Sequence, residues 1–98
     1  MAIIEVSIVP VGTKDPGISN FVAEAVKTFK NSGVKFELTS MGTILEGEIS
    51  QLLSIIHKAH ESCFKTGAKR VLTNIKIDDR RDRAQTGEEK IRTVLKKL

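Results

Sequence analysis

The sequence contains a single cysteine and no tryptophan or tyrosine, and no apolar run long enough to cross a bilayer, which takes about 20 residues. With Cys63 alone, no disulfide can form within the chain, as is typical of proteins in the reducing cytoplasm. The N-terminal segment lacks the basic start of a signal peptide, and Glu5 interrupts its apolar stretch. We therefore expect a cytoplasmic protein without a membrane partner.

Proline and low-complexity segments are also scarce, which is typical of a folded globular chain. The 98 residues suffice for one domain, and such a chain buries roughly 60–70% of the surface that its unfolded state exposes. A core of that size leaves little margin of stability, so burial against another copy of the chain would supplement it. We expect residues 1–98 to form a single domain that self-associates.

The net charge of +4 is unevenly distributed along the chain. Residues 65–98 hold 11 basic and 5 acidic residues, whereas residues 1–64 hold 5 basic and 7 acidic ones. A basic C-terminal third can attract phosphates, nucleic acid or an acidic partner. The simpler interpretation is that Lys and Arg solvate two surface helices, and we favour it because charge alone defines neither a fold nor a site.

Hydrophobic periodicity predicts four strands and three helices. Alternating apolar residues indicate strands over residues 3–11, 34–39, 43–49 and 71–78. Apolar residues at helical spacing indicate helices over residues 19–31, 50–66 and 86–98. The order of the first six elements is that of the split βαβ unit. We predict an α+β fold, a ferredoxin-like βαββαβ antiparallel sheet with an additional C-terminal helix over residues 86–98.

Capping and turn residues mark the ends of these elements. Ser19, Ser50 and Thr86 are the expected N-caps, because a hydroxyl there can accept a free backbone N–H of the first helical turn. Gly33 stands where a helix commonly ends in a left-handed residue. Gly42 is expected to supply the unusual dihedral angle of a tight turn between the second and third strands.

In this fold both helices of the unit pack on one face of the sheet, which leaves the other face open. That face is expected to be polar, with Glu5, Ser7, Lys35, Glu37, Thr39, Glu46, Glu48, Asn74 and Lys76. It either meets water or pairs with the sheet of another subunit. The last helix has a narrow apolar stripe and must cover its own sheet edge or a neighbouring chain.

The sequence gives little support for a catalytic or metal-binding site. Cys63 follows His60 by three residues on one predicted helix, but a nucleophilic pair also needs a cleft and an orienting group. A buried core cysteine is the favoured interpretation. His57 and His60 can share a helix face, yet no second ligand cluster follows, so we favour a surface pair. We expect no catalytic residue, no metal and no enzyme activity.

The sequence also gives limited support for a phosphate-binding or nucleic-acid-binding site. Residues 11–14 precede a helix but lack the spacing of a P-loop or a dinucleotide-binding fingerprint, so a plain turn is favoured. RNA-binding domains of this topology stack bases on aromatic residues of the open face. The four phenylalanines are predicted on helices or on the core side of a strand. We do not expect nucleic acid as a partner.

Carboxylates on the open face provide one further candidate site. Glu46 follows the turn at Gly42, and Lys76 and Asp78 project from the same side of the last strand. Such a mixed-charge surface can bind an organic cation that has hydrogen-bonding edges. It can equally form salt bridges between strands or subunits, and the residues alone do not separate these two interpretations.

Several segments together resemble a known family. They are residues 10–13 (PVGT), 19–23 (SNFVA), 41–47 (MGTILEG) and 70–81 (RVLTNIKIDDRR). In this order and spacing they are similar to the YkoF-like family of small thiamine-binding proteins, and the likeness covers essentially the whole chain. The resemblance implies a ferredoxin-like fold in a homo-oligomer, commonly a dimer of dimers.

The resemblance further implies that the protein binds thiamine, or its hydroxymethylpyrimidine part, as a ligand without turnover and without a cofactor. Such a ligand requires a carboxylate, hydroxyls and an apolar wall. In this chain the implied binding residues are Thr13, Ser19, Phe21, Met41, Gly42, Thr43, Glu46, Lys76 and Asp78. Glu46 would meet the pyrimidine edge or the positive charge, Thr43 and Ser19 would hydrogen-bond, and Phe21 or Met41 would supply the wall.

Overall fold

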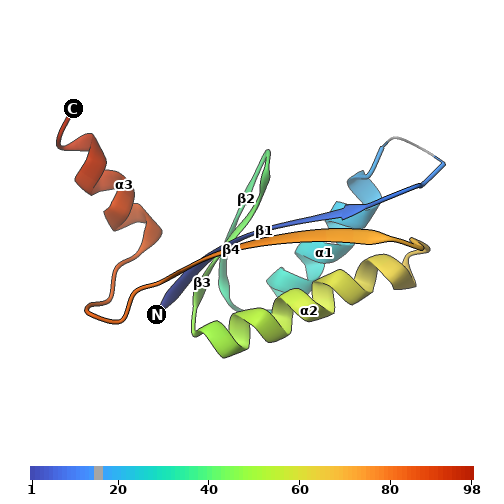
Figure 1. Cartoon of the computed structure of the whole chain (residues 1–98), viewed down its shortest axis with the longest axis horizontal. Coiled ribbons are helices and arrows are strands. Elements are labelled where there is room, and N and C mark those ends of the chain that lie inside the picture. The colour runs from blue at the N-terminus through green and yellow to red at the C-terminus, as the bar shows by residue number, and fades with distance from the viewer. Residues whose placement is uncertain (15–16) are drawn as a thin grey trace.

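The computed structural model describes residues 1–14 and 17–98 and has the predicted α+β architecture (Figure 1). Its elements in chain order are β1 (Ala2–Pro10), α1 (Ser19–Ser32), β2 (Lys35–Thr39), β3 (Gly42–Gly47), α2 (Ile49–Lys65), β4 (Val71–Asp79) and α3 (Gly87–Leu95). All strands pair antiparallel in the order β2-β3-β1-β4. This order confirms the ferredoxin-like fold.

Helices α1 and α2 lie together on one face of the sheet (Figure 1). The hydrophobic core fills the space between these helices and the sheet. Alternation along β1 turns Ile4 and Val6 toward the helices, and Leu45 of β3 lies beside Ile4. Phe29 of α1 and Leu52 of α2 complete this layer, and all five side chains are buried. Removal of this apolar surface from water supplies the main favourable free energy of folding.

Two of the predicted helix ends are confirmed and two are wrong. Gly33 ends α1 in a left-handed conformation with φ 77°, and the Thr86 side chain accepts a hydrogen bond from the Glu89 N–H in a capping box at α3. In contrast, α1 already begins at Ser19, and α2 begins one residue before Ser50. The start of α2 is displaced because the apolar residue before Ser50 packs against the core and is drawn into the first turn.

Gly42 is required for a different reason from the one expected, because its φ is not positive. A Cβ atom at this position would lie 2.7 Å from the backbone oxygen of Val6. The glycine therefore permits close approach of the hairpin to β1, where a side chain would collide with backbone. The prediction of an unusual dihedral angle at Gly42 is wrong, whereas the predicted tight turn is present.

The open face of the sheet carries rows of side chains that run across the strands. One row contains Lys35, Glu46, Ile3 and Asp78, and the next contains Glu37, Ile44, Glu5 and Lys76. The face is therefore less polar than expected, since isoleucines interrupt both rows. Glu48, also expected there, instead precedes the first turn of α2 in an extended conformation, because β3 ends at Gly47.

Helix α3 stands apart from the packed unit (Figure 1). Gly87 is half-buried, and the residues that follow it in α3 are exposed. The radius of gyration is 14.7 Å, whereas a compact chain of this length has about 12–13 Å. Helix α3 therefore does not cover the edge of its own sheet, which was one of the two expected placements.

Candidate ligand-binding cavity

A cavity of about 260 Å³ lies on the helix side of the sheet, between α1 and the tip of the β2–β3 hairpin. Its lining includes Val6 from β1, Val22 and Phe29 from α1, and Leu38 and Met41 from the hairpin. Helical spacing along α1 places Val22, Ala25, Val26 and Phe29 on the wall of the cavity, together with Ile18 just before the helix. Apolar side chains from β1, α1 and the hairpin thus line a space large enough for one ring.

The tip of the hairpin is held in shape by its own hydrogen bonds. The Thr39 hydroxyl donates to the Gly42 carbonyl oxygen at 2.9 Å and accepts from the Met41 N–H at 3.2 Å. These bonds fix the two-residue turn, because Thr39 and Gly42 are directly paired across the strands. Met41 lies in this turn and is 81% exposed, so it contributes to the cavity lining while most of its surface meets solvent.

Thr43 is the buried polar side chain of the cavity. Its strand position beside Val6 turns it toward the helices, and it is 5% exposed. Among the described residues, its hydroxyl has no hydrogen-bond partner, although every fully enclosed polar side-chain atom has one. The hydroxyl therefore meets the cavity, where a bound molecule can satisfy it.

The lining of the cavity is uncharged within the described part of the chain. Its polar side chains are hydroxyls, from Ser7, Thr39, Ser40 and Thr43. A few hydroxyls among apolar walls suit a neutral, flat ring with hydrogen-bonding edges. A charged group would lose its hydration here without gaining an ionic partner from this lining.

The structure brings one group of the predicted binding residues to this cavity. Met41, Gly42 and Thr43 line it. Ser19 and Phe21 lie in the first turn of α1, next to lining residues of the same turn, but neither belongs to the lining itself. Thr13 lies outside the lining, in the connection between β1 and α1.

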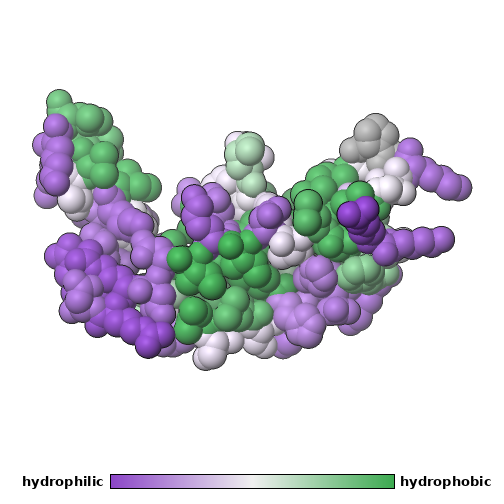
Figure 2. Space-filling model, viewed as in Figure 1, coloured by the Kyte–Doolittle hydropathy of each residue, from purple (hydrophilic) through white to green (hydrophobic). Residues whose placement is uncertain are grey.

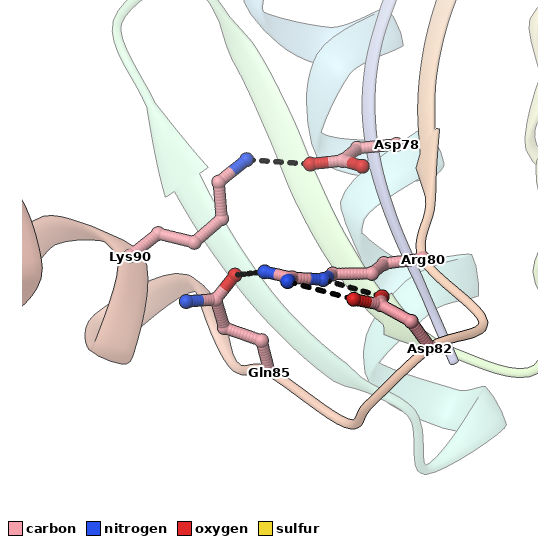
Figure 3. A network of polar contacts seen from close by, with 5 residues as sticks. All are labelled: Asp78, Arg80, Asp82, Gln85 and Lys90. Atoms are coloured by element: carbon pink, nitrogen blue, oxygen red, sulfur yellow. Dashed lines mark hydrogen bonds and ion pairs between the residues drawn. The ribbon is translucent and has the colours of Figure 1, made fainter.

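Glu46, Lys76 and Asp78 form a second group on the opposite face of the sheet. The Glu46 side chain is 8% exposed, lies 3.3 Å from the Lys35 ammonium and accepts a 2.8 Å hydrogen bond from the Gly87 N–H. Asp78 pairs with Lys90 of α3 at 2.5 Å (Figure 3). Both carboxylates thus hold the first turns of α3, and the structure does not bring them to the cavity.

Sequence reasoning missed the cavity wall on α1. Helical spacing over residues 19–31 identifies an apolar face, but it does not tell what lies against that face. The available signal was the glycine at 42, which indicates that the hairpin tip approaches another part of the backbone closely. That approach shapes the cavity between the hairpin and α1.

The other candidate groups form structural contacts. Burial raises the pKa of the Cys63 thiol, a hydrogen bond with Ser62 opposes the shift, and Cys63 is 1% exposed. His60 Nδ1 lies 2.6 Å from the Thr73 hydroxyl. Within residues 1–14 and 17–98, no three His, Cys, Asp or Glu side chains are placed to hold a metal ion. Nor is any described helix long and apolar enough to cross a membrane.

Comparison with protein families identifies the chain. The profile of the family described as thiamine-binding protein matches residues 4–95, which is nearly the whole sequence. The chain belongs to this family. The match includes both the hairpin tip at the cavity and the start of α3, so the family assignment covers both groups of predicted binding residues.

Relatives and solved structures agree with this assignment. The UPF0045 protein YqgV of Bacillus subtilis is 45% identical over 102 aligned positions, covering 100% of this chain and 98% of that protein. The crystal structure of a hypothetical protein from Methanocaldococcus jannaschii has a TM-score of 0.86 at 35% identity, covering 95% of this chain and 94% of that chain. A putative thiamine biosynthesis/salvage protein from Thermotoga maritima has a TM-score of 0.81 at 22% identity, covering 95% and 97%, and shows the shared fold alone.

Proposed function

We propose that the protein binds thiamine or its hydroxymethylpyrimidine moiety without converting it, and that the cavity beside α1 is the site. The observation that carries this proposal is the cavity of about 260 Å³, whose described lining is uncharged and whose wall holds the Thr43 hydroxyl, which has no partner among the described residues. Membership of the thiamine-binding family supports the class of ligand. Buried Cys63, with its raised thiol pKa, offers no nucleophile for turnover.

The pyrimidine ring is the part of thiamine that suits this cavity. A flat ring can stack against the apolar wall formed by Val22 and Phe29, with Met41 over its outer face. A ring nitrogen or the exocyclic amine can pair with the Thr43 hydroxyl, which would then act as donor or acceptor. Such a polar contact orients the ring, while removal of apolar surface from water supplies the affinity.

The cationic thiazolium ring has no carboxylate in the described lining. We therefore infer that it projects from the mouth of the cavity near Met41, where water solvates its charge. On this proposal the two-ring and one-ring ligands bind with similar affinity, since only the pyrimidine is enclosed. The family resemblance implies Glu46 and Asp78 as contacts; on this proposal they serve the attachment of α3, with which both make polar contacts.

Calorimetry with hydroxymethylpyrimidine and thiamine tests the proposal. Thr43→Val keeps the shape of the side chain but removes its hydroxyl, so affinity should fall about three- to tenfold, which corresponds to about 0.5–1.5 kcal/mol. Thr66→Val removes an exposed hydroxyl at the end of α2 and serves as the matched control. Absence of heat and of a thermal shift at millimolar ligand would overturn the proposed function.

We also propose that the protein self-associates through α3, as a homodimer or a dimer of dimers. Ile91, Val94, Leu95 and Leu98 lie at helical spacing and are at least 59% exposed. Figure 2 shows apolar surface over α3 and over the middle of the molecule, where β4 forms the free edge of the sheet. Ile75 and Ile77 of this strand are 44% and 42% exposed, and edge strands of this kind commonly pair with another chain.

Light scattering after size exclusion tests self-association. Replacing Ile91 and Leu95 by Glu places charge on the stripe and should yield a monomer at micromolar concentration, whereas Glu88→Gln on the same helix should keep the wild-type mass. A wild-type protein that is monomeric under these conditions would overturn this second proposal.

A further inference from the structure

The net charge of the protein resides in its last 19 residues. Residues 80–98 hold seven basic and three acidic residues, a net charge of +4, whereas residues 1–79 hold nine of each and are neutral overall. This segment contains the loop after β4 and helix α3. Figure 2 shows hydrophilic residues gathered over the loop beside α3. A field of one sign is thus concentrated where the loop meets the helix.

A cleft of about 340 Å³ lies between this loop and α3. Its charged side chains are Arg83 from the loop and Glu89, Arg92 and Lys96 from the helix. Arg92 and Lys96 are one helical turn apart, so both project toward the loop side of α3. Three cations therefore meet one carboxylate in a single cleft, which has a net positive charge.

Three cations beside the cleft are paired, whereas those inside it, and Lys97 after α3, are not paired with any described residue. Arg80 pairs with Asp82, Arg81 with Asp79, and Lys90 with Asp78. Arg83, Arg92 and Lys96 form no ion pair or side-chain hydrogen bond with any residue in the described ranges, 1–14 and 17–98. The three cations of the cleft therefore remain available to an anionic ligand.

Hydrogen bonds hold the cleft in shape. The Arg80 guanidinium donates to both carboxylate oxygens of Asp82, at 2.6 and 2.9 Å, and to the Gln85 side-chain oxygen at 3.0 Å (Figure 3). These bonds join the two ends of the loop segment that carries Arg83. At the helix, the Glu89 carboxylate accepts from the Thr86 N–H, which directs its charge to the helix start. Pre-organisation of this kind lowers the entropic cost of binding.

We propose that this cleft binds the phosphate groups of a small di- or triphosphate compound. Two guanidinium groups and one ammonium match such a polyanion, because each guanidinium can donate two parallel hydrogen bonds to phosphate oxygens. The cleft is also larger than one phosphate group requires. This site is separate from the cavity beside α1, and its assignment does not depend on the proposed function.

Calorimetry with inorganic tripolyphosphate tests the proposal at low salt. Combining Arg92→Gln with Lys96→Gln should lower the affinity at least tenfold, since each charge-assisted hydrogen bond contributes about a factor of ten. The control combines Lys58→Gln with Lys69→Gln, which removes the same charge from exposed, unpaired positions elsewhere. It should change the affinity less than about threefold, because salt screens distant charges.

Two outcomes would overturn this assignment. Equal losses in the cleft and control variants would mean that the net charge, and not the cleft, attracts the anion. Tighter binding of a short DNA duplex than of tripolyphosphate, at equal phosphate concentration, would identify a nucleic-acid surface. Arg92→Lys keeps the charge but loses the fork geometry, and an affinity between those of the wild type and the double variant is the expected result. Hydroxymethylpyrimidine affinity should be unchanged in all of these variants.

Discussion

The two faces of the sheet share the same strands but have opposite chemistry. On the helix side, β3 turns Thr43 and Leu45 toward an uncharged layer that ends in the cavity. On the open side, the same strand turns Ile44 and Glu46 toward charged rows to which α3 is attached. Residues 41–47 form one continuous motif in the sequence, but their side chains are divided between the two faces of the sheet, because side chains alternate along a strand.

This comparison also separates two sources of stability. The helix side is stabilised by buried apolar contacts, which are numerous and non-directional. The attachment of α3 depends on a few polar contacts, from Glu46 to Gly87 and from Asp78 to Lys90. The two regions should therefore respond differently to substitution, to pH and to salt.

The largest effect is expected on the helix side. Phe29→Ala removes a ring that is 1% exposed and should lower the free energy of unfolding by about 3–5 kcal/mol. Ile91→Ala on the exposed stripe of α3 is the matched apolar control, and for the monomer it should cost less than about 0.5 kcal/mol. Urea denaturation measures both. Equal costs would contradict the contrast between the packed unit and α3.

A smaller, local effect is expected on the open side. Glu46→Ala leaves the Gly87 N–H and the Lys35 ammonium without their partner, and should cost about 1–3 kcal/mol. Hydrogen exchange should rise in residues 87–95 and change little in α1. Glu37→Ala, an exposed carboxylate on the same face, is the control and should leave α3 unaffected. Unchanged exchange in α3 would mean that Glu46 does not attach the helix.

The smallest effect concerns the titration of the loop after β4. Hydrogen bonds from Arg80 lower the pKa of Asp82 to about 2, from an ordinary value of 3.8. A lowered pKa stabilises the folded state above the ordinary value, and this contribution is lost as the pH falls through about 2. The loop pair should therefore persist at pH 4, where unpaired carboxylates begin to protonate.

Carbon-detected NMR titration of the Asp82 carboxyl measures this pKa directly. Arg80→Gln removes the guanidinium and should return the midpoint toward 3.8. Arg83→Gln removes a neighbouring cation that makes no ion pair with Asp82, and it should move the midpoint much less. A midpoint near 3.8 in the wild-type protein would contradict the pairing shown in Figure 3.

The fold followed from the sequence because alternation and helical spacing are local signals. The four strands, the three helices and the caps at Gly33 and Thr86 were all predicted within a few residues. The predicted N-caps Ser19 and Ser50 lie inside α1 and α2, and at α2 the packing of Ile49 against the core draws it into the first turn. Local preference yields to packing when the two disagree.

The candidate site was only partly predictable. Met41, Gly42 and Thr43 were named because the segment 41–47 resembles the thiamine-binding family, and the structure places all three in the lining of the cavity. Strand alternation alone places Glu46 and Thr43 on opposite faces of the sheet, but it does not predict what Glu46 contacts. Its hydrogen bond to Gly87 joins residues 41 positions apart, and no local pattern reports where α3 returns to the sheet.

An NMR titration of the labelled protein with hydroxymethylpyrimidine tests the central claim most directly. If the ligand occupies the helix-side cavity, the backbone amide signals of Val22, Gly42 and Thr43 should shift with a common saturation curve. The amide signals of Lys35, Asp78 and Gly87, on the open side, should stay in place. Shifts that gather around Glu46 and the start of α3, with none at Thr43, would contradict the account and place the ligand on the open face.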